Sequence, residues 1–72
     1  MEWQFSGTPE VAAPGWYAVL VCYDPREGVF PASAEWDGSN WMHRAVVAFG
    51  DLCETAVQAE DLAYYNDLGD SQ

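Results

Sequence analysis

The sequence predicts an α+β fold in which a three-stranded antiparallel β-meander packs against one C-terminal α-helix. Three observations predict it. Residues 16–23 form an apolar run rich in aromatic and β-branched side chains, two turn signals follow this run, and the hydrophobic period becomes helical after Gly50. A chain of 72 residues suffices for one small core. We therefore expect a single domain over residues 1–72.

Residues 1–15 precede the apolar run and contain two prolines and two glycines. This composition is typical of irregular structure. We expect an irregular N-terminal arm that packs Trp3 or Phe5 on the core.

The β-meander is predicted over residues 16–49. Residues 16–23 are apolar at both parities, which indicates a central strand covered on both faces. Asp24 and Pro25 favour a type I turn into a second strand, in which Pro31 indicates an edge or a bulge.

The second turn signal is the Asp-Gly pair at residues 37 and 38. This pair favours a short hairpin turn, although a four-residue loop over residues 37–40 would place Trp36 directly opposite Trp41. Either register makes residues 41–49 the third antiparallel strand.

An amphipathic helix is predicted over residues 51–67, followed by a frayed tail over residues 68–72. Thr55 and Gln58 have the spacing of a capping box, and Asp51 with Glu54 offers an earlier start. The predicted buried stripe consists of Leu52, Ala56, Ala59 and Ala63, with Leu62 at its margin.

Charge is the most unusual feature of the chain. Twelve Asp and Glu residues oppose only two Arg, which gives a formal net charge of -10, while half of the residues are hydrophobic. This combination favours a folded acidic domain, because disorder requires low hydrophobicity as well as high charge. Such a surface repels nucleic acid and anionic membranes and attracts basic protein surfaces. With no signal peptide or membrane span in the sequence, we expect a cytoplasmic protein.

Catalytic and metal motifs are not found in the sequence. His43 is the only histidine, and Asp51 and Glu54 would oppose any activation of Cys53 by the helix N-terminus. The residue spacings match no zinc site, calcium loop or phosphate-binding loop. We expect no enzyme, no cofactor and no metal. Cys22 and Cys53 are interpreted as reduced, partly buried thiols, with one disulfide as the alternative.

The carboxylates suggest a more specific hypothesis, which is mimicry of nucleic acid. Duplex DNA presents one charge per about 1.7 Å of axis, and a rigid acidic protein can occupy the same basic groove. Arg44 is expected to neutralise Glu35 across the hairpin. The predicted partner-binding surface comprises Asp24, Glu27, Glu35, Asp37, Asp51, Glu54, Glu60, Asp61 and Asp67.

Three motifs carry a resemblance to known proteins. The run "PGWYAVLVCYDPREGVFPASAEWDGSNW", followed by "VVAFGD" and "AEDLAYYND", resembles small phage and prophage proteins over about residues 14–67. In size and acidity the chain is also similar to anti-CRISPR proteins, some of which mimic DNA. The resemblance implies a phage-derived inhibitor that occupies the DNA or protospacer-adjacent-motif site of a bacterial defence complex. Its partner would be a basic surface such as that of the large subunit of a type I surveillance complex.

Two other functions fit the sequence. Trp36, Trp41, Tyr64 and Tyr65 could anchor a non-catalytic interaction module with a polar rim of acids. A small hydrolase or metal enzyme is disfavoured, because it would need a catalytic constellation. The chain is expected to bind no nucleic acid directly and to be a monomer or a weak dimer.

Overall fold

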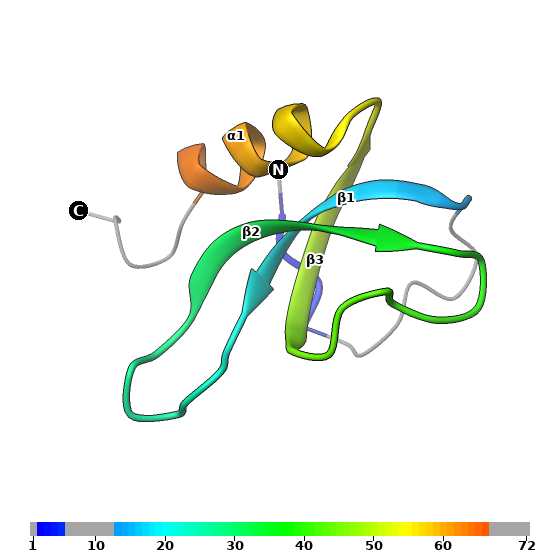
Figure 1. Ribbon diagram of the computed structural model, residues 1–72. Coiled ribbons are helices and arrows are strands. Elements are labelled where there is room, and N and C mark those ends of the chain that lie inside the picture. Colours follow the sequence, from blue (N-terminus) through cyan, green and yellow to red (C-terminus); the bar gives the residue numbers. More distant parts are fainter. Residues whose placement is uncertain (1, 6–12, 67–72) are drawn as a thin grey trace.

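The computed structural model describes residues 2–5 and 13–66, and these form one sheet and one helix (Figure 1). The elements are β1 (Gly15–Val21), β2 (Phe30–Trp36), β3 (Val46–Cys53) and α1 (Ala56–Tyr65). Both strand pairings are antiparallel. The predicted α+β class, with three antiparallel strands and one C-terminal helix, is confirmed.

The strand order is β2-β1-β3, with β1 in the centre. In a meander β3 would pair with β2, whereas here it pairs with β1, so the predicted order is corrected. The reason lies in β1 itself, where every residue from Tyr17 to Val21 is buried. A strand that is apolar on both faces gains most when both of its edges and both of its faces are covered. The central position predicted for this run is confirmed.

The loop after β2 follows the four-residue alternative, but the strand after the loop differs from the prediction. Trp36 forms an isolated antiparallel bridge with Trp41, and the amide of Asp37 donates to the carbonyl of Asn40 at 3.1 Å. Pairing with β2 stops soon after the amide of Met42 donates to the carbonyl of Glu35. The third strand therefore occupies residues 46–53 instead of 41–49.

Packing of Trp41 explains this shift. Its ring lies 5.7 Å from the ring of Tyr17 and 5.1 Å from that of Trp36, in edge-on arrangements. Tyr17 belongs to the central strand, so the chain after Trp41 crosses one face of the sheet before it begins β3. Burial of the indole there outweighs continued pairing along the edge of β2.

The helix is shorter than predicted. The hydroxyl of Thr55 accepts a hydrogen bond from the amide of Gln58, so the predicted capping box marks the true start of α1. The earlier start at Asp51 is wrong, because residues 51–53 continue β3 and Cys53 pairs with Trp16. Asn66 caps the other end. Residues 67–72, which include Asp67 and the predicted tail, lie outside the described residues.

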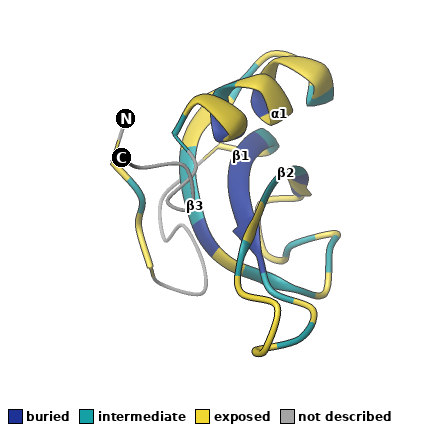
Figure 2. Cartoon of the chain, turned by 90° about the vertical axis from the view of Figure 1, so that its left-hand side faces the viewer, coloured by how far each residue is buried: buried dark blue, intermediate teal, exposed yellow. Residues whose placement is uncertain are grey.

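Figure 2 shows α1 over one face of the sheet and the central strand β1 buried along most of its length. On one face α1 presents the fully buried Ala59 and Ala63. Alternation along β1 turns Ala18 and Leu20 toward this helix, and the small side chains permit close approach. The opposite face carries the main core, which consists of Tyr17, Val19, Val21, Ala34 and Trp36 with Trp41 and Phe49 packed against it.

Residues 2–5 of the arm lie along the outer edge of β3. Gln4 exchanges two backbone hydrogen bonds with Phe49, at 2.8 and 3.0 Å. The indole nitrogen of Trp3 donates to the carbonyl of Asn66 at 2.7 Å, which ties the arm to the end of α1. Trp3 is half-buried, as expected for an anchor, whereas Phe5 is exposed. The arm is shorter than predicted, because Gly15 belongs to β1.

Candidate protein-binding surface

All predicted partner-binding acids other than Asp67 are described, and all of these lie at the surface. Asp24 is half-buried and the others are exposed, and the described residues contain no buried charged side chain. A carboxylate at the surface stays ionised and can attract a positively charged partner. The fold therefore displays these acids, although it does not gather them into one cluster.

Six of these acids lie at the two ends of the sheet, whereas Glu60 and Asp61 lie on α1. Asp24 and Glu27 lie in the turn between β1 and β2. Asp37 and Glu54 lie at the opposite end, because Asp37 follows the residue that pairs with Gly15 and Glu54 follows the residue that pairs with Trp16. Asp51 lies near the end of β3, toward the same end of the sheet. We call Glu35, Asp37, Asp51 and Glu54 the acidic end.

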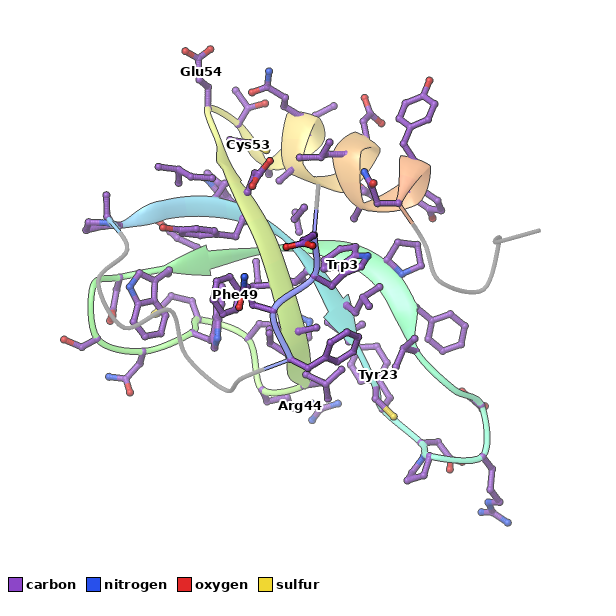
Figure 3. All side chains as sticks on the ribbon, turned by 180° about the vertical axis from the view of Figure 1, so that it is seen from behind. Trp3, Tyr23, Arg44, Phe49, Cys53 and Glu54 are labelled. Atoms are coloured by element: carbon purple, nitrogen blue, oxygen red, sulfur yellow. The ribbon has the colours of Figure 1, made fainter. Side chains whose placement is uncertain are left out.

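Both arginines lie away from the acidic end. Arg26 sits in the β1–β2 turn, where its Nε is 3.6 Å from Asp24 in an exposed and therefore weak ion pair. The guanidinium of Arg44 lies 5.9 Å from the ring centre of Tyr23, directly beyond β1 (Figure 3). The prediction that Arg44 neutralises Glu35 is wrong, because cation–π contact holds it near this turn. Among the described residues, the acidic end carries no arginine.

Asp37 is held in its ionised form. Its carboxylate accepts hydrogen bonds from the amides of Asn40 and Ser39, at 2.6 and 2.7 Å. These two bonds, led by the one from Asn40, lower the pKa of Asp37 below its ordinary value. The hairpin loop thus fixes one negative charge at the acidic end.

The last residues of β3 and one side of α1 enclose an open groove of about 380 Å³. Gln58, Leu62 and Tyr65 face it because positions separated by three and four residues share one side of a helix. Across from them, Cys53 and Glu54 lie at the end of β3 beside α1 (Figure 3). We call this the β3–α1 groove, and its lining consists of Leu52, Cys53, Glu54, Gln58, Leu62 and Tyr65.

Sequence reasoning missed this groove. Leu52 was expected in the buried stripe of the helix, but it lies in β3 and is 47% exposed. The spacing of Gln58, Leu62 and Tyr65 was the available signal. It could not be interpreted without knowing that β3 ends beside these three side chains.

The two cysteines are free and lie at opposite ends of the sheet. Cys22 follows the residue that pairs with Val46, whereas Cys53 pairs with Trp16. This separation excludes a disulfide between them in the folded chain. Burial, followed by the charge of Asp51, raises the pKa of the Cys53 thiol, and a backbone hydrogen bond from Ala18 opposes the rise only in part. At neutral pH this thiol is protonated and weakly nucleophilic.

The four aromatic residues of the alternative hypothesis do not share a surface. Trp36 is 4% exposed and belongs to the core, and Trp41 packs against that core. Tyr64 and Tyr65 are exposed on α1. Of these four residues, only the two tyrosines are therefore available to a partner as an aromatic anchor.

Both ring nitrogens of His43 lie within hydrogen-bonding distance of other residues of the chain. Its Nδ1 accepts a hydrogen bond from the amide of Ala45, and its Nε2 lies 3.0 Å from the hydroxyl of Tyr23. Over residues 2–5 and 13–66, no three His, Cys, Asp or Glu side chains are grouped as a metal site would require. The helix in this part of the chain is not long and apolar enough to cross a membrane.

Comparison with known proteins identifies no relative: no protein-family model, curated protein or solved structure matches the chain. The likeness to phage and anti-CRISPR proteins therefore stays a prediction from its sequence motifs.

Proposed function

We propose that this protein is a phage-derived inhibitor of a bacterial DNA-binding defence complex and acts as an acidic mimic of DNA. One observation carries the proposal: a chain with a formal net charge of -10 folds so that the described carboxylates face solvent and both arginines lie away from the acidic end. Its site of action is the bacterial cytoplasm. It needs no catalytic group and no cofactor.

The spacing of the acidic end supports mimicry. Asp37 and Glu54 extend strands that lie on either side of β1, so they are separated by two strand spacings, about 10 Å. Glu35 and Asp51 add two further charges to this span. Duplex DNA presents about six charges over the same distance, so the two charge densities are of the same order. A groove of Lys and Arg shaped for phosphates can therefore accept this end of the protein.

The partner follows from the resemblance as well as from the charge. Similarity to anti-CRISPR proteins favours the surface of a type I surveillance complex that reads the protospacer-adjacent motif, on the large subunit. Long-range attraction between the acidic protein and this basic surface makes association fast and sensitive to salt. While the inhibitor is bound, DNA is excluded from the same surface.

A capture experiment tests the proposal. The immobilised protein is exposed to bacterial lysate at low and at high salt, and each captured complex is identified and assayed for DNA binding. We expect a DNA-binding complex that is retained at low salt and released by high salt or by duplex DNA. Capture that is indifferent to both would overturn the proposal.

A matched pair of variants makes the test specific. Asp51→Asn with Glu54→Gln removes two charges from the acidic end, whereas Asp24→Asn with Glu27→Gln removes two from the opposite end. Both variants have the same net charge, and all four side chains lie at the surface. We expect the first variant to lose more capture than the second. Equal loss would mean that total charge alone drives binding.

A second function, a non-catalytic interaction module, is favoured by the two exposed tyrosines of α1. Tyr65 is 88% exposed and Tyr64 is 57% exposed. Exposed aromatic side chains are frequent anchors in protein interfaces. This function predicts capture that depends only weakly on salt and is lost in Tyr65→Ala.

A further inference from the structure

We propose that the β3–α1 groove binds a short segment of a basic partner protein that presents one aliphatic side chain flanked by lysine or arginine. This inference rests on the proposed function for the basic nature of the partner. It adds a specific anchor to a surface that otherwise acts through charge. Side-chain burial at such an anchor gives an interface affinity that charge steering alone does not.

The apolar part of the groove is already formed. Leu52 from β3 and Leu62 from α1 are among its lining residues, and Tyr65, which also lines it, is 88% exposed. A volume of about 380 Å³ lies at the small end of the range for binding pockets, about 300 to 1,000 Å³. The groove is also open. It therefore suits one inserted side chain from a longer segment better than an enclosed small molecule.

Gly15 helps to form this part of the groove. A Cβ atom added at Gly15 would lie 2.6 Å from Cδ1 of Leu52, so the absence of a side chain leaves the space that Leu52 occupies. Leu52 itself remains 47% exposed. The Leu52 side chain thus lies against the start of β1 and leaves about half of its surface exposed.

Charge around the groove selects a cationic segment. Glu54 lines the groove, Asp51 precedes the lining residues on β3, and Asp61 is adjacent to Leu62 on α1. All three are exposed. The negative charge of Asp51 reaches the groove, because it contributes to the raised pKa of the Cys53 thiol. Within the described residues, both arginines lie outside this region.

The start of α1 does not reverse this preference. An uncapped helix N-terminus attracts anions through its free amides. Here the amide of Gln58 donates to the hydroxyl of Thr55, and the amide of Glu54 donates to the side chain of Gln58. Both of these donors are satisfied within the chain, and the carboxylate of Glu54 adds negative charge beside them.

Synthetic peptides provide the direct test, with the full chain labelled with ¹⁵N. The probe is acetyl-Lys-Arg-Leu-Lys-Arg-amide, and its controls replace Leu by Ser or every basic residue by Glu. We expect the leucine peptide to bind about tenfold more tightly than the serine peptide, because only leucine fills the apolar part. The largest amide shifts should occur at the groove lining. The glutamate peptide should not bind.

Neighbouring residues offer matched control variants. Tyr65→Ala should weaken binding of the leucine peptide about tenfold, whereas Tyr64→Ala, which removes the same exposed ring outside the groove lining, should change it less than twofold. Glu54→Gln should weaken binding more than Glu60→Gln, since only Glu54 lines the groove. Both tyrosines are exposed, so the folded state should survive either change.

Four outcomes would overturn the groove proposal: equal affinity of the leucine and serine peptides, amide shifts centred on another face, equal effects of the two tyrosine variants, or groove shifts that depend on protein concentration without peptide. The last would assign the groove to a second copy of the chain. The peptide assay needs no DNA-binding complex. Peptide binding without capture of such a complex would retain the groove and reject the proposed function, and the reverse result would reject the groove alone.

Discussion

Gly15 and Leu52 lie on adjacent strands and approach each other closely. A Cβ atom added at Gly15 would lie 2.6 Å from Cδ1 of Leu52. Gly15 also has a φ of +153°, which L-residues rarely adopt. This contact couples the beginning of the central strand to the β3–α1 groove. It makes Gly15 a residue on which both stability and the shape of the groove depend.

Replacement of Gly15 by alanine should therefore destabilise the fold by about 1 to 3 kcal/mol through backbone strain, and the added Cβ should displace the Leu52 side chain. Urea unfolding measures the loss. Gly28→Ala is the control, because its φ of +84° is also unfavourable but no atom lies within 4 Å of the added Cβ. Only Gly15→Ala should shift the Leu52 methyl resonances. Unchanged Leu52 resonances in that variant would contradict the coupling.

Trp41 determines where the third strand begins, since its ring spans Tyr17, Trp36 and Phe49. Trp41→Ala should cost about 2 to 4 kcal/mol in the free energy of unfolding, because a large, partly buried ring leaves a cavity. Met42→Ala provides the control. Met42 is 65% exposed, so its loss should remain within about 0.5 kcal/mol. Similar losses in the two variants would contradict the role of Trp41.

The Asp37 loop should make stability depend on acidic pH. Because the folded state lowers the pKa of Asp37 below 3.8, the unfolded state binds a proton more readily. The stabilisation is thus present above pH 3.8 and is lost as the pH falls through the lower folded-state pKa. Asp37→Asn should flatten this part of the profile in urea unfolding measured against pH. An identical acid profile in the variant would reject the assignment.

Cys53 should react slowly with iodoacetamide at neutral pH, because burial and the charge of Asp51 raise the pKa of its thiol. Measured in a Cys22→Ala background, the rate should increase only at more alkaline pH than for a free cysteine. Asp51→Asn should move this increase toward lower pH. A profile that does not respond to Asp51→Asn would show that the carboxylate exerts no field on the groove.

The sequence predicted the parts of the fold that depend on local signals. The central strand followed from an apolar run at both parities. The bridge from Trp36 to Trp41 and the helix start at Thr55 were each one of two alternatives that the local signals offered. Each of these features involves residues close together in the chain. Their physical causes are visible in the local pattern.

The rest depended on contacts between distant residues. Because Trp41 packs on Tyr17, the third strand begins later than predicted and pairs with β1 instead of β2. No pattern in the sequence near Trp41 indicates this ring contact. The same shift extended β3 through residues 51–53 and shortened the helix. It also placed Leu52 beside α1 and created the groove. The sequence predicted which residues are acidic, but their separation into two ends followed from the strand order.

Competition with DNA tests the central claim most directly. The affinity of the captured defence complex for duplex DNA is measured with increasing amounts of this protein, and then with the Asp51→Asn, Glu54→Gln variant. Mimicry predicts that the apparent affinity for DNA falls in proportion to the concentration of the wild-type protein and falls less with the variant. Simultaneous binding of DNA and protein to the complex, with DNA affinity unchanged, would contradict the claim.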